Sequence, residues 1–170
     1  TVKLWSAATG QCLRTLKTHS NWVLSVAFDG TGEMLISGHQ DGQIRLWNQA
    51  TGICLKTLQG HASPVSVVLL LPQETAPTSI DRSPISQGAD RGLNCQLASC
   101  SDDRTIKLWD LKRGECLKTL WGHQGCIQSI TVSPDGSTLA SGSHDHTIKI
   151  WDWRSGECLQ TLEGHLHRVK

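Results

Sequence analysis

Serine, histidine and aspartate recur along this chain at constant offsets from a tryptophan, and these three residue types can form a hydrolytic triad. A serine lies ten residues before each of three tryptophans, an aspartate lies six residues before it, and a histidine opens the same segment. The three sets are His19, Ser37, Asp41 and Trp47; His61, Ser99, Asp103 and Trp109; and His123, Ser141, Asp145 and Trp151. A catalytic set occurs once in an enzyme, and no Gly-x-Ser-x-Gly motif exposes a serine nucleophile. We therefore expect these residues to be structural, and we expect no catalytic residue.

Histidine and cysteine side chains could also bind a metal ion, but their spacing does not favour a metal site. His144 and His146 flank Asp145, yet the equivalent segments carry Gln40 and Asp102 in place of His144. The chain contains no Cys-x-x-Cys spacing. We expect neither a metal nor a cofactor.

Four of the seven cysteines occupy one repeated position, seven residues after a tryptophan. They are Cys12, Cys54, Cys116 and Cys158. Equivalent positions in successive repeats are separated by the width of a repeat, which is poorly suited to a disulfide. We expect each of them to be a small buried hydrophobic residue in a reduced cytosol.

Two markers share one period along the chain. The tryptophans Trp5, Trp47, Trp109 and Trp151 are 42, 62 and 42 residues apart, and the histidines His19, His61, His123 and His165 have the same spacings. One supersecondary unit is therefore repeated, with 20 extra residues in the middle copy. In the last full copy, alternating or β-branched segments separated by turn residues predict four strands, at residues 126–132, 137–143, 147–152 and 158–162.

A period in the low forties, with Gly-His early and Trp-Asp late, resembles the WD-repeat family of β-propellers. The resemblance implies an all-β fold of four-stranded antiparallel blades, with three complete blades and partial blades at the ends. The expected units are a partial blade at 1–18, blades at 19–60, 61–122 and 123–164, and the start of another at 165–170. The second blade contains the insertion, at about 73–94, which is either functional or mobile. Because the half blades do not add up to a whole one, we expect an excerpt of a larger propeller.

The resemblance also assigns a role to the recurring side chains. In this family a histidine, a serine or threonine, an aspartate and the tryptophan join in a hydrogen-bonded network within each blade, here the three sets given above. A buried indole N–H needs an acceptor, and a buried carboxylate needs donors. The near-identity of the repeats further resembles bacterial, especially cyanobacterial, WD-repeat proteins, in which propeller arrays are often attached to signalling ATPase or kinase domains.

Function should lie where the repeats differ and are exposed. In propellers of this family, the turns before the first strand and between the second and third strands share one face, called here the top face. The expected partner-binding residues of the top face are Ser20, Trp22, Gln40, Pro64, Asp102, Trp121, Gln124, Cys126, His144 and Arg168. Trp22 and Trp121 either anchor a partner or pack over a blade edge. Trp153 is expected on the opposite face.

Composition narrows the function classes. The chain has 16 basic and 15 acidic residues, so its net charge of +1 does not favour nucleic-acid binding. No apolar run reaches membrane-spanning length. The innermost strands carry no ionisable side chain except Cys126, which argues against an enzyme. We expect a cytoplasmic, non-catalytic scaffold that binds a protein or peptide. The alternative is a regulatory or sensor propeller of a larger signalling ATPase or kinase, whose partners could be other domains of the same parent chain.

Overall fold

The computed structural model describes residues 1–17, 21–72 and 96–170, and every regular element in these ranges is a β-strand. The expected all-β class is therefore confirmed. Within the described ranges no helix is long and apolar enough to cross a membrane. The expected insertion at about 73–94, and the predicted site residues His19 and Ser20, lie outside the described residues.

The described strands form one two-stranded and three four-stranded antiparallel sheets. The two-stranded sheet contains β1 (Val2–Trp5) and β2 (Cys12–Leu16). The first four-stranded sheet contains β3 (Val23–Phe28), β4 (Met34–His39), β5 (Ile44–Asn48) and β6 (Cys54–Leu58). The second contains β7 (Val65–Leu70), β8 (Gln96–Ser101), β9 (Ile106–Asp110) and β10 (Glu115–Leu120). The third contains β11 (Ile127–Val132), β12 (Leu139–Ser143), β13 (Ile148–Asp152) and β14 (Glu157–Leu162).

The turn between β11 and β12 shows how local sequence ends a strand. Gly136 has a φ of 72°, a conformation that a side chain disfavours, and its N–H donates to the Ser133 carbonyl over 2.8 Å. The Asp135 carboxylate accepts hydrogen bonds from the Ser137 N–H and hydroxyl, as expected for an aspartate that closes a turn. The chain therefore reverses direction and pairs β12 with β11.

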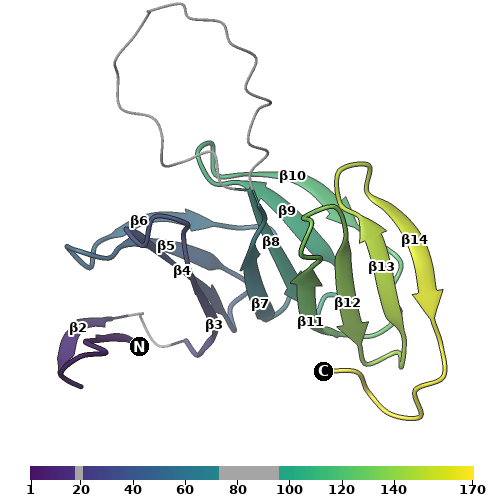
Figure 1. The fold of residues 1–170 in the computed structure, drawn as a ribbon, viewed down its shortest axis with the longest axis horizontal. Helices are drawn as coiled ribbons and strands as arrows, with labels where there is room; N and C mark the ends of the chain where they lie inside the picture. Colours follow the sequence, from purple (N-terminus) through teal and green to yellow (C-terminus); the bar gives the residue numbers. More distant parts are fainter. Residues whose placement is uncertain (18–20, 73–95) are drawn as a thin grey trace, which may run out of the picture.

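The sheets fan around their first strands (Figure 1). β7 contacts both β3 and β11, and β6, β10 and β14 lie at the outer ends of their sheets. Each four-stranded sheet runs outward from its first strand to its fourth in sequence order. This is the strand order of propeller blades, and it places the first strands β3 and β11 on either side of β7.

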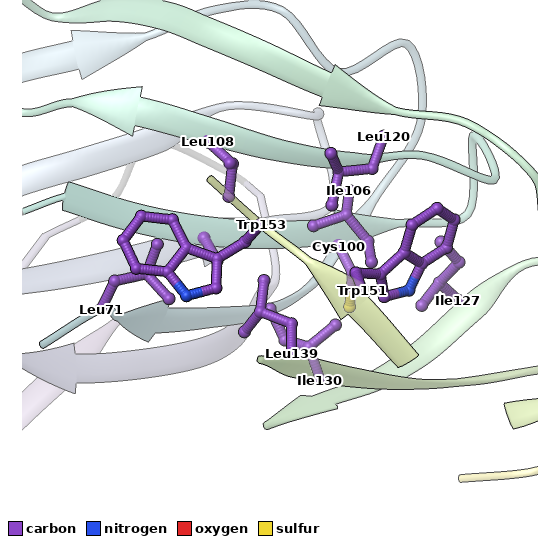
Figure 2. Packing of buried hydrophobic residues seen from close by; sticks show 11 residues of the cluster. Leu71, Cys100, Ile106, Leu108, Leu120, Ile127, Ile130, Leu139, Trp151 and Trp153 are labelled. Carbon is purple, nitrogen blue, oxygen red and sulfur yellow. The ribbon is translucent and has the colours of Figure 1, made fainter. Parts of the chain in front are cut away.

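The hydrophobic core is divided among the spaces between neighbouring sheets. Trp151 is buried with Ile106 and Leu120 of the preceding sheet, and Figure 2 shows its indole among these side chains. Trp109 is likewise buried against Ile36 of its own preceding sheet. Burying side chains of this size contributes about 1.5–3 kcal/mol each. Neighbouring sheets therefore depend on one another for stability.

The outer strands are joined to the next sheet by a repeated polar contact that the sequence did not reveal. Arg14 on β2 donates to the Thr51 carbonyl over 3.0 Å. Lys56 on β6 donates to the Lys112 carbonyl over 2.7 Å. Lys118 on β10 donates to the carbonyls of Arg154 and Ser155 over 2.6 and 2.7 Å. Each cation thus binds the turn between the third and fourth strands of the following sheet, where carbonyl groups are exposed.

Two burial predictions were wrong. Cys12, Cys54, Cys116 and Cys158 are exposed instead of buried, because they lie on the outermost strand of each sheet, where no further strand covers them. Cys100, on β8, is the one buried cysteine among those the structure describes, and burial raises the pKa of its thiol to about 12. Trp153 is not a surface residue: it is buried beside Leu71 and donates to the Gly136 carbonyl over 3.1 Å.

The two-stranded sheet leaves one face of β3 uncovered. Val26 on β3 is 52% exposed, whereas the equivalent Val68 on β7 and Ile130 on β11 are 4% and 8% exposed. Val68 packs against the neighbouring sheet, within reach of Gly38. Val26 is more exposed because the sheet before its own has only two strands, whereas Val68 and Ile130 follow sheets of four strands.

Candidate functional site

The second and third four-stranded sheets each contain a complete hydrogen-bonded network of the recurring side chains. In the third sheet, the indole Nε1 of Trp151 donates to the Ser141 hydroxyl over 2.8 Å. Ser141 Oγ lies 2.8 Å from Nε2 of His123, and Nδ1 of His123 lies 2.8 Å from the Asp145 carboxylate. His61, Ser99, Asp103 and Trp109 repeat these contacts in the second sheet, with all three distances again 2.8 Å.

The protons of this network can be assigned from its donors and acceptors. Because the carboxylate can only accept, Nδ1 of His123 carries the proton, and Nε2 accepts from the Ser141 hydroxyl. Burial lowers the pKa of His123, although Asp145 opposes this shift, so the ring is neutral. Partial burial would raise the pKa of Asp145, but hydrogen bonds from Thr147, Gln124 and His123 outweigh it and hold that pKa well below its usual range.

These side chains do not form a hydrolytic site. Ser99 and Ser141 are buried, and each hydroxyl is held between an indole and an imidazole. A nucleophile must reach its substrate, whereas these oxygens face the interior of the protein. Their arrangement ties the second and third strands of a sheet to the turn that precedes its first strand.

In the first four-stranded sheet, whose expected His19 lies outside the described residues, Ser37 and Asp41 have further partners. Ser37 again accepts from the Trp47 indole over 2.8 Å, and its hydroxyl lies 2.7 Å from Nε2 of His39. Asp41 accepts from Asn21 over 2.7 Å and from Arg45 over 2.8 Å. Sequence reasoning missed His39. The sequence did distinguish this residue, because at the position of His39 the other two full repeats carry serines, Ser101 and Ser143.

His39 is a buried histidine whose ring is only partly satisfied. Its Nδ1 has no hydrogen-bond partner among the described residues. Burial, followed by the nearby Arg45 guanidinium, lowers the pKa of His39 to about 4. The imidazole is therefore neutral at pH 7, and its protonation would be unfavourable in the folded chain.

The predicted top-face positions are joined in pairs by backbone hydrogen bonds. The N–H of Gln40 donates to the Trp22 carbonyl over 3.0 Å, and that of Asp102 donates to the Pro64 carbonyl over 3.1 Å. His144 and Cys126 form the same bond in the third sheet, at 2.8 Å. In each sheet the turn between the second and third strands therefore lies beside the start of the first strand.

Four of the predicted residues line one cleft at the inner strands, which we call the inner cleft. Its volume is about 410 Å³, and its lining residues are Trp22, Leu24, Gln40, Pro64, Ser66, Asp102 and Gln128. Side chains from three successive sheets therefore meet around it. Trp22 is 70% exposed, so its indole is available to a ligand.

The other predicted top-face residues do not line the inner cleft. They are Trp121, Gln124, Cys126, His144 and Arg168. Trp121 is 71% exposed and directly follows β10, the outermost strand of its sheet. The structure therefore places Trp22 at the inner cleft and Trp121 outside it.

Three residues of the inner cleft were missed from the sequence. Leu24, Ser66 and Gln128 occupy the same position, two residues after Trp22, Pro64 and Cys126, respectively. They are the second residues of β3, β7 and β11, and alternation along a strand turns this position away from the first residue, which is partly buried in β3 and buried in β7 and β11. The sequence did indicate this position, because the three repeats carry different residues there: leucine, serine and glutamine.

Asp102 is the ionisable side chain of the inner cleft. Its Oδ1 accepts from Nε2 of Gln128 over 2.7 Å and from the Ser66 hydroxyl over 3.4 Å. None of the ion pairs seen in residues 1–17, 21–72 and 96–170 involves Asp102. The described residues also contain no group of three or more His, Cys, Asp or Glu that could hold a metal ion.

Comparison with known proteins identifies the repeat. The family model described as "WD domain, G-beta repeat" matches residues 10–48, 52–110 and 114–152. The nuclear distribution protein PAC1 of Arthroderma benhamiae is 35% identical over 141 residues, which is 82% of this chain and 28% of that protein. PAC1 of Fusarium vanettenii is 36% identical over 152 residues, covering 82% of this chain and 32% of the relative. The mouse F-box-like/WD repeat-containing protein TBL1X is 51% identical over 43 residues, covering 25% of this chain and 8% of that protein.

The chain therefore spans about a third of the length of the PAC1 proteins that it matches. These relatives are fungal and murine, and they give no support to the expected bacterial resemblance. Each family match begins just before the outermost strand of one sheet and ends with the third strand of the next sheet, and together the matches include most of the chain. On this evidence the chain belongs to the WD-repeat family.

Proposed function

We propose that this chain is a non-catalytic scaffold that binds a protein or peptide partner on its top face, with the inner cleft as the centre of contact. The observation that carries the proposal is Trp22, an indole 70% exposed beside a cleft of about 410 Å³. Exposed tryptophans beside a pocket are frequent anchors of protein interfaces. The expected cytoplasmic location, and the absence of nucleic-acid and membrane partners, belong to the same proposal.

The chemistry of the inner cleft supports binding over catalysis. Its lining contains one ionisable side chain, Asp102, and two amides, Gln40 and Gln128. A catalytic carboxylate would work with a second acid or a base, and the described lining supplies neither. The Ser66 hydroxyl donates to Asp102 over 3.4 Å and has no histidine beside it among the lining residues to activate it as a nucleophile. A regulatory propeller of a larger ATPase or kinase rests only on the similarity of the repeats, so we place it second.

The test is a pull-down from cell extract with the full-length protein, followed by measurement of the partner's affinity for purified variants. Trp22→Ala should weaken binding about 30-fold, as expected when an anchor worth about 2 kcal/mol is lost. Trp121→Ala is the matched control, because its indole is equally exposed but lies outside the inner cleft.

Leu117→Ala serves as a second control, since Leu117 is exposed on the outer strand β10. Unchanged affinity in Trp22→Ala would contradict the proposal. Loss of binding in Trp121→Ala alone would move the contact from the inner cleft to the outer part of the top face.

A further inference from the structure

The inner cleft combines one carboxylate with an apolar wall, and this combination selects a class of side chain. We infer that it takes a cationic side chain, an arginine or a lysine, presented by a protein partner. The inference deepens the proposed function and rests on it. It concerns the chemistry of the residue that enters the cleft, whereas the proposed function concerns the surface that is used.

Hydrogen bonds hold the carboxylate of Asp102 in place through one of its two oxygens. The backbone N–H of Asp102 is fixed to the Pro64 carbonyl, and its Oδ1 accepts from Gln128 and Ser66. In the described part of the chain, no donor reaches Oδ2. A positioned carboxylate with a vacant acceptor can bind an ammonium or guanidinium group through a charge-assisted hydrogen bond.

The neighbouring side chains suit the remainder of a basic residue. Trp22, Leu24 and Pro64 offer apolar surface to the methylene groups that a lysine or arginine places along a protein. An exposed indole face also attracts a cation directly. These residues lie on β3 or directly before β3 and β7, Asp102 follows β8, and Gln128 on β11 holds its carboxylate, so the site exists only when three sheets are packed together.

Charge decides against the other classes of ligand. Among the described residues, no lysine, arginine or histidine lines the inner cleft, so none of them would stabilise an incoming carboxylate or phosphate. An apolar side chain would exclude water from Oδ2 of Asp102 without offering it a donor, at an energetic cost. At the position of Asp102 the other two sheets carry Gln40 and His144. The single negative charge thus comes from the second sheet alone.

The test uses three capped pentapeptides with glycine at four positions and arginine, citrulline or glutamate at the centre. Citrulline keeps the shape of arginine and removes its charge. Each peptide is titrated into the full-length protein labelled with ¹⁵N at tryptophan, and the indole N–H signal of Trp22 reports occupancy of the inner cleft. We expect the arginine peptide to shift this signal to saturation, the citrulline peptide to bind about tenfold more weakly, and the glutamate peptide not to bind.

Asp102→Asn is the critical variant, because asparagine keeps the shape and an acceptor for Gln128 but removes the charge. It should lower the affinity for the arginine peptide to that for citrulline, whereas Asp135→Asn, a charge change on an exposed turn, should leave it unchanged. Rising salt should weaken binding to the unmodified protein and not to Asp102→Asn.

Equal binding of the arginine and citrulline peptides, or undiminished binding by Asp102→Asn, would overturn the inference while leaving the top face as a partner surface. Failure of all three peptides to shift Trp22 would also overturn it. The proposed function would then still be decided by the pull-down with Trp22→Ala. The two claims are therefore refuted by different results.

Discussion

Replacing Asp145 by alanine should destabilise the third four-stranded sheet without removing any apolar contact. The Asp145 carboxylate accepts four hydrogen bonds, from His123 Nδ1, the Gln124 N–H, the Thr147 N–H and the Thr147 hydroxyl, at 2.7 to 3.0 Å. The His123 side chain is fully buried, so its Nδ1–H would lose its partner where water cannot replace it.

The expected loss of folding stability follows from these contacts. An unsatisfied buried donor costs about 1–3 kcal/mol. Gln124 is exposed and can turn to water, while Thr147 Oγ1 lies 3.4 Å from His123 Nδ1 and can replace part of the lost acceptor. We therefore expect a loss of about 2 kcal/mol, and a melting temperature lower by roughly 4–8 °C for a chain of this size.

The assay is thermal unfolding followed by circular dichroism, combined with amide hydrogen exchange resolved by strand. Exchange should increase most in β11–β14, where the network lies. Asp135→Ala is the control, since it removes an aspartate from an exposed turn of the same sheet. If the two variants melted at the same temperature, or if exchange increased equally in all sheets, the argument from a buried network would be refuted.

Two further predictions concern contacts between sheets and the effect of acid. Lys118→Met should lower stability by about 0.5–1 kcal/mol in the same melting assay, because it removes the hydrogen bonds to the exposed carbonyls of Arg154 and Ser155, which water can then solvate. Lys149→Met, which loses only a threonine partner, should cost less. Stability should fall as the pH drops from about 6.5 toward 4, because burial lowers the pKa of His39 to about 4 and the unfolded chain therefore binds the proton more readily than the folded one. His39→Ser should flatten this part of the pH profile, and an unchanged profile would contradict the assignment. Below about pH 4 the carboxylates of Asp103 and Asp145, whose pKa values are lowered in the folded chain, should lose their stabilising charge and steepen the fall.

The strands and the recurring network could be predicted from the sequence because both depend on local or strictly periodic features. The strands expected at 126–132 and 147–152 are observed as β11 (Ile127–Val132) and β13 (Ile148–Asp152). Alternation of side chains and turn residues sets such segments over a few neighbours in the chain. The 42-residue spacing then aligns equivalent side chains, so that His123 meets Asp145 in one repeat as His61 meets Asp103 in another.

Only the tertiary structure decided which faces are covered and which side chains meet across sheets. The sequence pattern predicted a buried Cys54 and a Trp153 on the face opposite the top face, yet the cysteine is exposed on an outer strand and the tryptophan is buried beside Leu71. Likewise, Trp22 and Asp102 are 80 residues apart and share the inner cleft, because β3 and β7 pack side by side. Burial and the composition of a cleft depend on what packs against a residue from elsewhere in the chain, and a local pattern does not contain that information.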